Sequence, residues 1–126
     1  MPKRDRSRSK RDISTDRILL HLSDGLKEAV DPDDVYYIDA TEGDTIVRFR
    51  AAKAKKDVRR LDEIAPLFER FGFLRVHRSY LVNVNRIRFL RRRGPRDWEL
   101  QLDPPVNALI PVGREAYGRV VAAFEG

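Results

Sequence analysis

The chain has 126 residues and a formal net charge of +6, with 26 Lys and Arg residues against 20 Asp and Glu residues. This length provides room for one hydrophobic core, so a single domain is expected. The chain has no cysteine, which excludes disulfides, thiolate metal sites and cysteine nucleophiles. No apolar run is long enough to cross a bilayer, and a soluble cytoplasmic protein is expected.

The positive charge is unevenly distributed along the chain. Residues 1–12 carry six basic and two acidic residues, a net charge of +4, and contain no aliphatic residue. We expect them to form a disordered basic arm ahead of one folded domain at residues 13–126. Residues 75–96 contain eight arginines and no carboxylate, whereas residues 24–44 contain eight acidic residues against one lysine. This segregation favours one face that binds a polyanion.

The first half of the chain predicts short antiparallel strands. Strands are expected at residues 17–22, 26–30, 35–40 and 45–51. Asp and Gly residues separate them in two places, Ser23-Asp24-Gly25 and Glu42-Gly43-Asp44, which is typical of hairpin turns. In the fourth strand, alternation directs Val47 and Phe49 inward and leaves Arg48 and Arg50 outside.

Residues 58–70 have the only clear helical period. The apolar positions that share one face are Leu61, Ile64, Ala65, Leu67 and Phe68. Pro66 lacks a backbone donor, so the helix either kinks there or begins late, with Pro66 in its first turn. Gly72 is suited to the left-handed conformation that ends many helices.

The next segment, residues 73–83, has the sequence Phe-Leu-Arg-Val-His-Arg-Ser-Tyr-Leu-Val-Asn. Leu74 and Val76 alternate with Arg75 and His77, which predicts a strand with one buried face. The alternation stops at Arg78. The polar side chains are then expected together at the rim where the strand ends.

The remaining sequence predicts three more strands, at residues 87–92, 98–102 and 108–112, and a closing helix within residues 113–124. An Arg-Gly-Pro-Arg loop at residues 93–96 joins the first two of these strands. Trp98 alternates with Leu100 and Leu102, which indicates a core position. The whole pattern predicts a mainly β domain of antiparallel strands with one or two short helices.

Three segments resemble motifs of the LytTR family of bacterial DNA-binding domains. Residues 73–83 fit its Phe-x-Arg-x-His-Arg-Ser-Tyr-x-Val-Asn run, residues 35–40 its Ile-x-Tyr-Ile-Glu-Ala strand, and residues 110–114 its Pro-Val-Ser-Arg turn. The resemblance covers about residues 35–124. This chain departs from the family at Gly113, where Ser is usual, at Asp39, where Glu is usual, and at Thr45, where a larger residue is common. The resemblance implies an elongated stack of small antiparallel sheets with loops that enter DNA grooves.

The resemblance also implies which side chains contact DNA. The base-reading positions of the family correspond to Thr45, Arg78 and Arg114. Arginine can bridge O6 and N7 of guanine in the major groove, whereas a threonine offers only a methyl or hydroxyl contact.

Phosphate contacts are expected from the other polar residues of the motif and from the arginine-rich loop. These residues are Arg75, His77, Ser79, Arg91, Arg92, Arg93 and Arg96. The four loop arginines repel one another unless an anion lies between them, and phosphate oxygens are natural anions. Two alternatives remain open: a local hydrogen bond from His77 to a backbone carbonyl, and a merely solvated hairpin tip for the loop.

The sequence therefore predicts sequence-specific binding of double-stranded DNA in transcription regulation, as in the output domain of a response regulator. No metal-ligand spacing, phosphate loop or nucleophile motif is present, so neither catalysis nor a cofactor is expected. No exposed heptad seam or long apolar patch is evident, so a monomer in solution is expected, and the resemblance supports two copies on paired direct repeats. An RNA-binding or protein-interaction module that uses the same basic face is the alternative. RNA readers usually interleave aromatic and basic residues, and the only candidates, Tyr36 and Tyr37, lie in the acidic segment.

Overall fold

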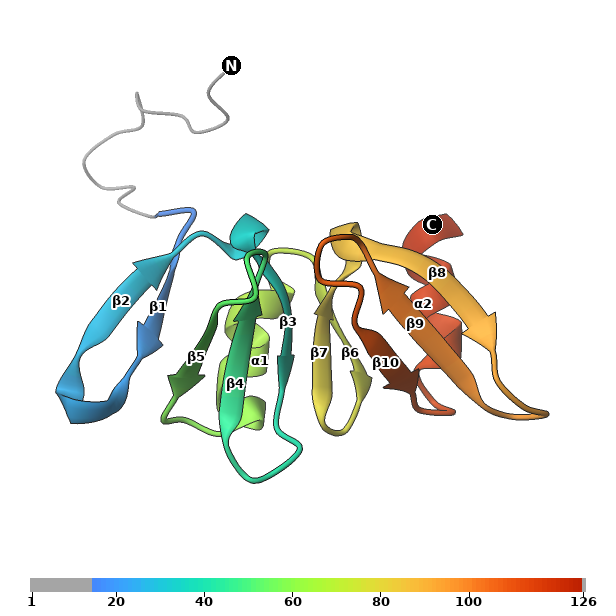
Figure 1. Cartoon of the computed structure of the whole chain (residues 1–126), viewed down its shortest axis with the longest axis horizontal. Coiled ribbons are helices and arrows are strands. Elements are labelled where there is room, and N and C mark those ends of the chain that lie inside the picture. The colour runs from blue at the N-terminus through green and yellow to red at the C-terminus, as the bar shows by residue number, and fades with distance from the viewer. Residues whose placement is uncertain (1–14, 126) are drawn as a thin grey trace, which may run out of the picture.

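The computed structural model describes residues 15–125, which form ten strands and two helices (Figure 1). The prediction of a basic arm at residues 1–12 falls outside this range. The elements are β1 (Ile18–His21), β2 (Lys27–Val30), β3 (Val35–Asp39), β4 (Thr45–Phe49), β5 (Ala54–Asp57), α1 (Leu61–Glu69), β6 (Phe73–His77), β7 (Tyr80–Asn83), β8 (Ile87–Arg92), β9 (Trp98–Leu102), β10 (Leu109–Val112) and α2 (Tyr117–Glu125). Short 3-10 turns, η1 (Ser23–Gly25), η2 (Pro32–Asp34) and η3 (Val84–Arg86), lie between strands.

The strands form three antiparallel sheets that follow one another along the long axis (Figure 1). The first sheet is the β1–β2 hairpin, the central sheet has the order β5-β4-β3-β7-β6, and the third has the order β10-β9-β8. The predicted fold class, a mainly β stack of small antiparallel sheets with two short helices, is therefore confirmed.

The central sheet is buried on both faces. One face packs with β1, β2 and α1 in a core whose fully buried members include Leu20, Ile38, Val47, Ile64, Phe68 and Leu81. The other face packs with the third sheet and α2, in a core that includes Tyr36, Val76, Val82, Leu100, Leu102 and Val120. The neighbours Leu81 and Val82 thus enter different cores, which explains why the sequence of β7 is an apolar run and does not alternate.

Helix α1 begins at Leu61, so Pro66 lies inside it and the alternative of a late start is wrong. The missing N–H of Pro66 leaves the carbonyl of Asp62 without its helical donor, but both residues are exposed and water can replace the bond. The predicted apolar face is confirmed, with Leu61, Ile64, Ala65 and Phe68 buried. Gly72 follows the helix with a φ of +88°, as its left-handed role predicted.

Strand β5 has no counterpart among the predicted strands. Its sequence, Ala-Lys-Lys-Asp, contains no apolar residue larger than alanine, so periodicity gives no signal. The strand is fixed by its ladder to β4, in which Thr45 pairs with Asp57, and by an ion pair of 2.6 Å between Lys55 and Glu28.

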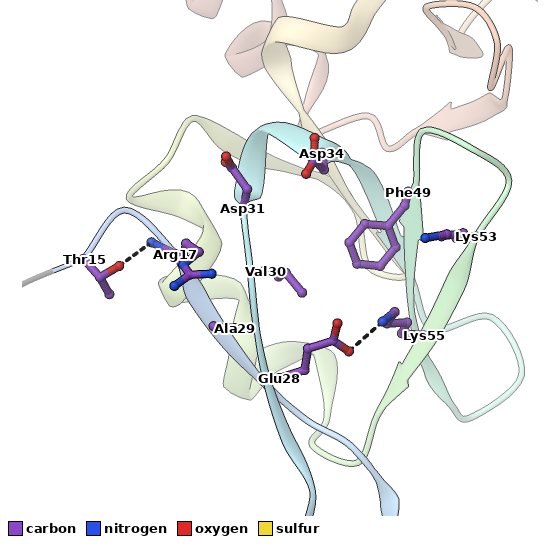
Figure 2. Close-up of a pocket in the computed structure, with 10 residues that line it drawn as sticks. All are labelled: Thr15, Arg17, Glu28, Ala29, Val30, Asp31, Asp34, Phe49, Lys53 and Lys55. Carbon is purple, nitrogen blue, oxygen red and sulfur yellow. Dashed lines mark hydrogen bonds and ion pairs between the residues drawn. The ribbon is translucent and has the colours of Figure 1, made fainter. Parts of the chain in front are cut away.

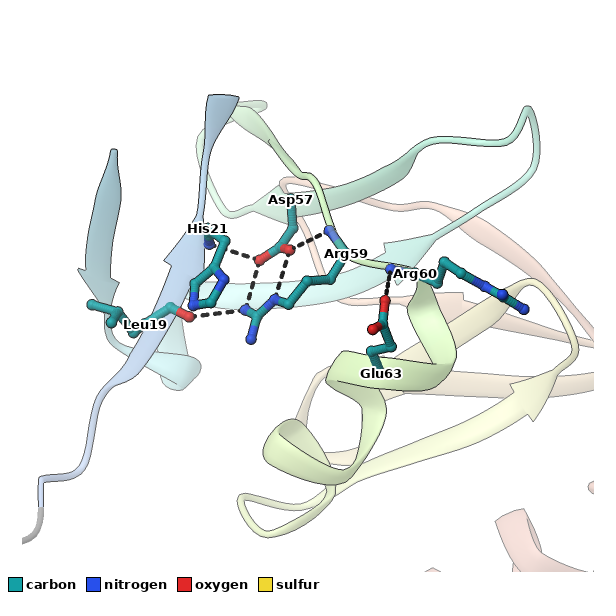
Figure 3. A network of polar contacts seen from close by, with 6 residues as sticks. All are labelled: Leu19, His21, Asp57, Arg59, Arg60 and Glu63. Carbon is teal, nitrogen blue, oxygen red and sulfur yellow. Dashed lines mark hydrogen bonds and ion pairs between the residues drawn. The ribbon is translucent and has the colours of Figure 1, made fainter. Parts of the chain in front are cut away.

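Asp57, at the end of β5, joins the first sheet to the central sheet (Figure 3). Its fully buried carboxylate accepts hydrogen bonds from the backbone N–H of His21 at 2.9 Å and from Nε and Nη2 of Arg59 at 3.0 and 2.9 Å. The same guanidinium donates to the carbonyl of Leu19 at 3.0 Å. Burial acts to raise the pKa of Asp57, but these hydrogen bonds and the charge of Arg59 outweigh it, so the pKa is lowered.

Candidate nucleic-acid interface

Three connections gather at one edge of the molecule: the β6–β7 turn, the end of β10 and the β8–β9 loop (Figure 1). Each of them carries arginines that the sequence singled out. The acidic turn η2, at the start of β3, lies at the opposite edge (Figure 1). The segregation in space is only partial, because the β3–β4 turn, which holds Glu42 and Asp44, lies at the same edge as the arginines (Figure 1).

The β6–β7 turn is a two-residue turn of Arg78 and Ser79, closed by the pair His77 and Tyr80. Arg78 is exposed. The Nδ1 atom of His77 accepts a hydrogen bond from the backbone N–H of Ser79 at 3.1 Å, and the carbonyl of Ser79 accepts one from Ala40 at 3.0 Å. Burial lowers the pKa of His77, and the charges of Arg78 and Arg75 lower it further, so the imidazole is neutral at pH 7. The bond expected for His77 was to a backbone carbonyl; the structure instead shows its ring nitrogen accepting from a backbone N–H.

A bulge in β6 connects this turn to the end of β10. The register of β6 against β7 shifts between Arg75 and His77, which leaves Val76 outside the ladder. The carbonyl of Val76 instead accepts a hydrogen bond of 2.7 Å from the N–H of Gly113, directly after β10. This bond brings Arg114 to the same edge as Arg78. A Cβ on Gly113 would meet only the carbonyl oxygen of Val76 at 3.6 Å, an ordinary contact, so the serine that is usual in the family would fit here.

Two adjoining grooves lie at this junction. One, of about 440 Å³, is lined by Arg75, Arg78, Arg114 and Arg119 with parts of β6 and the start of α2. The other, of about 490 Å³, is lined by Arg93, Arg96, Trp98, Pro111 and neighbouring residues. His77, Gly113 and Arg114 line both grooves. Within the described residues, the guanidinium groups of Arg78 and Arg114 make no hydrogen bond or ion pair, so all their donors are free for a ligand.

The arginines around the β8–β9 loop are in unequal situations. Glu99, 8 % exposed, pairs with Arg91 at 3.3 Å and with Arg93 at 3.1 Å. The anion that the sequence required between these arginines is thus a protein carboxylate, and the inference that it must be phosphate is wrong for these two. Arg92 donates to the carbonyls of Gly94 and Pro95 in its own loop, at 3.0 and 2.8 Å.

Arg96 is the exception in this loop. It is exposed, and no hydrogen bond or ion pair involves its side chain in the part of the chain that the structure describes. It also lines the groove beside Arg114. Of the four loop arginines, Arg96 is therefore the one whose donors are all available to a phosphate.

The structure separates Thr45 from the other two predicted base-reading residues. Thr45 is 3 % exposed and pairs with Asp57 on β5. A side chain this deeply buried reaches no base edge, so the expectation of a base contact from Thr45 is corrected. The sequence did not predict the burial of Thr45, because this residue is covered by β5. The sequence of β5 has no apolar periodicity that would predict a strand.

A further groove of about 610 Å³ lies between the β1–β2 hairpin and the β4–β5 segment (Figure 2). Its charged lining consists of Arg17, Lys53 and Lys55 against Glu28, Asp31 and Asp34. The signs balance, and Lys55 is already paired with Glu28 (Figure 2). This groove lacks the excess of cations that a nucleic-acid backbone requires.

Glu99 provides a test of the loop arginines. Glu99→Gln removes one charge but keeps the shape, so Arg91 and Arg93 lose their intramolecular anion. We expect tighter binding to every DNA duplex by a similar factor, and a salt slope that is steeper by up to about two, since each phosphate contact adds about 0.9. Binding across a salt series measures both quantities.

Glu69→Gln is the matched control, because it removes an equal charge from the exposed end of α1. If Glu99→Gln and Glu69→Gln increase the affinity for DNA equally, net charge alone explains the change. Arg91 and Arg93 then do not contact phosphate.

The fold is an antiparallel β stack in which three exposed arginines, Arg78, Arg96 and Arg114, have no side-chain partner within residues 15–125 and lie at one edge. The LytTr DNA-binding domain model matches residues 27–125, and the chain belongs to this family. DNA binding in transcription regulation is accordingly the function of its class, which is one of DNA-binding domains and not of enzymes.

A solved structure supports the fold. The chain resembles, with a TM-score of 0.72 and 22% identity, the LytTr DNA-binding domain of a protein described as a methyl-accepting/DNA response regulator from Bacillus cereus. The match covers 90% of this chain and 100% of that one. None of the curated proteins matches the chain.

No helix within residues 15–125 is long and apolar enough to cross a membrane. No group of three or more His, Cys, Asp and Glu residues in that range is placed to hold a metal ion.

Proposed function

We propose that this protein binds double-stranded DNA by sequence, with Arg78 and Arg114 as the base-reading residues. The observation that carries this proposal is the hydrogen bond from Gly113 to Val76, which holds two exposed and unpaired arginines at one edge. Base discrimination requires a side chain that is held in one orientation, and both arginines follow short backbone segments that are held in place by hydrogen bonds. Their bidentate geometry suits guanine in the major groove.

Phosphate contacts in this proposal come chiefly from Arg96, with Arg92, His77, Ser79 and the basic arm at residues 1–12 in supporting roles. Arg91 and Arg93 are paired with Glu99 and are left out of this set. Contacts of this kind position the protein on the duplex without reading sequence. The neutral His77 would donate from Nε2, since its Nδ1 is occupied by Ser79. The protein is proposed to be a monomer in solution that places two copies on paired direct repeats.

Selection of bound sequences from a random duplex pool tests the proposal. We expect enrichment of a short motif that contains guanines and occurs twice in the same orientation. A pool of single-stranded RNA run in parallel tests the alternative. Equal recovery of unrelated duplexes would contradict sequence-specific binding, and preferential recovery of RNA would favour the alternative.

Arg96 offers a prediction about affinity without selectivity. Arg96→Ala should weaken binding to cognate and random duplexes by the same factor and reduce the salt slope by about one, because one phosphate contact is lost. Titrations of both duplexes across a salt series measure this. Arg70→Ala, at the far end of α1, is the control. A loss confined to the cognate duplex would instead identify Arg96 as a base-reading residue.

A further inference from the structure

The turn that carries Arg78 lacks the residues that usually stabilise a two-residue hairpin. Turns of this length that match the twist of the strands require a positive φ, which Asn and Gly supply. Neither Arg78 nor Ser79 has one; the non-glycine residues with a positive φ among residues 15–125 are Asp24, Ala52 and Asn107. The conformation of this turn therefore depends on groups outside it.

Arg75 supplies much of that support. Its Nε donates to the carbonyl of His77 at 3.0 Å, and its Nη2 donates to the carbonyl of Arg78. Its Nη1 donates to Oδ1 of Asp62 on α1 at 3.1 Å. One planar guanidinium thus fixes two successive carbonyls of the turn and anchors them to the helix. A lysine has neither the planarity nor the spacing of donors to do this.

The surroundings of Arg75 fit this internal role. Its side chain is 26 % exposed, whereas that of its partner Asp62 is 69 % exposed. Three of the five guanidinium N–H donors are directed at protein acceptors, and both carbonyls belong to the segment that presents Arg78. The carbonyl of Arg75 itself also accepts a bond of 3.4 Å from Arg119 on α2. The turn is consequently connected to both helices through this one residue.

We propose that Arg75 is a positioning residue for base recognition: it fixes the orientation of Arg78, and Asp62 orients Arg75. This inference rests on the proposed function, because it requires Arg78 to read a base. It replaces the expectation that Arg75 contacts a phosphate. The two roles depend on different properties of the side chain. A phosphate contact needs a positive charge within reach, whereas positioning needs the planar arrangement of guanidinium N–H donors.

The experiment compares Arg75→Lys, Arg75→Gln and Asp62→Asn with the wild type. Binding is measured to the cognate duplex, to a duplex changed at the base pair that Arg78→Ala identifies, and to a random duplex, across a salt series. A bidentate contact corresponds to discrimination of roughly 5- to 150-fold. Arg75→Lys should lower discrimination at that base pair at least about threefold and leave the random duplex and the salt slope unchanged.

The other variants extend the comparison. Arg75→Gln should behave as Arg75→Lys, and Asp62→Asn should shift discrimination in the same direction by less. Arg70→Lys is the matched control, since Arg70 is exposed and lies outside the turn. Melting temperatures show whether each variant folds. If the Arg75 variants do not fold, discrimination in the exposed Asp62→Asn variant tests the inference: reduced discrimination supports it, and wild-type discrimination overturns it.

Two results would overturn the inference by itself: wild-type discrimination in Arg75→Lys, or uniform weakening in Arg75→Gln with a salt slope lower by about one. The second would identify a phosphate contact. If Arg78→Ala leaves every base preference unchanged, the assignment of Arg78 as a base-reading residue fails, and the positioning role fails with it. The two failures are therefore distinguishable.

Discussion

Arg78→Ala and Arg114→Ala are each expected to lose affinity mainly for the cognate duplex and to relax the preference at one base pair. Both side chains are exposed and unpaired within residues 15–125, so their removal leaves no buried group without a partner. The free energy lost should be about 1–3 kcal/mol per arginine, the discrimination of a bidentate contact with guanine. The measurement is binding to cognate, singly substituted and random duplexes.

The control for this pair is Arg70→Ala, which removes an exposed arginine near the start of β6, away from the β6–β7 turn. Its binding to all duplexes should stay close to that of the wild type. A uniform loss from Arg78→Ala and Arg114→Ala, with the base preference unchanged, would reassign both residues to the phosphate backbone.

The second large effect concerns stability. Asp57→Ala leaves Arg59, and the backbone N–H groups of His21 and Arg59, without their shared acceptor. Breaking a buried pair from one side costs about 3–5 kcal/mol. We expect about 3 kcal/mol, the lower end, because the side chain of Arg59 is 21 % exposed and can regain some hydration. Urea unfolding at pH 7 measures the change.

The stability from Asp57 should also depend on pH. Its pKa is lowered from the ordinary 3.8, so the folded state holds the proton less tightly than the unfolded state does. The stabilisation is therefore complete above the unfolded pKa and is lost as the pH falls through the folded pKa. The stability difference between the wild type and Asp57→Asn should be constant near neutrality and shrink in acid below about pH 4. A difference that persists unchanged in strong acid would show that the carboxylate charge contributes nothing.

Much of the fold follows from local sequence patterns. Alternation and turn residues predict most of the strands, and the helical period identifies the buried face of α1. The side chain of Asn83 accepts from the N–H of Asn85 and so caps the turn η3 that follows β7. Trp98 packs in the second core, with its ring 4.5 Å from that of Tyr117. These features depend on neighbours in sequence, which is why a single sequence reveals them.

The features that the sequence did not predict depend on contacts between residues that are far apart in the chain. The burial of Thr45 requires β5, whose ladder is set by β4 and not by its own apolar residues. The pairing of Glu99 with Arg91 and Arg93 depends on the register between β8 and β9, which places Arg91 opposite Glu99. The hydrogen bond from Gly113 to Val76 requires the β-bulge in β6, which no residue type in the sequence predicts. The candidate site was therefore predicted from the family motifs and the arginine-rich segment, while the burial and pairing of each residue depend on tertiary structure.

The burial of the central sheet on both faces has a consequence for how this protein can change over generations. Residues such as Ile38 and Val82 determine whether the chain folds, and they lie in the two cores. Arg78 and Arg114 lie outside both cores, on connections at the rim. Under the proposed function, substitutions there would alter the preferred operator while the free energy of unfolding stays nearly constant, since surface changes usually cost under 0.5 kcal/mol. A duplicated copy of such a domain can diverge to a new set of promoters by single steps, each of which leaves a folded protein.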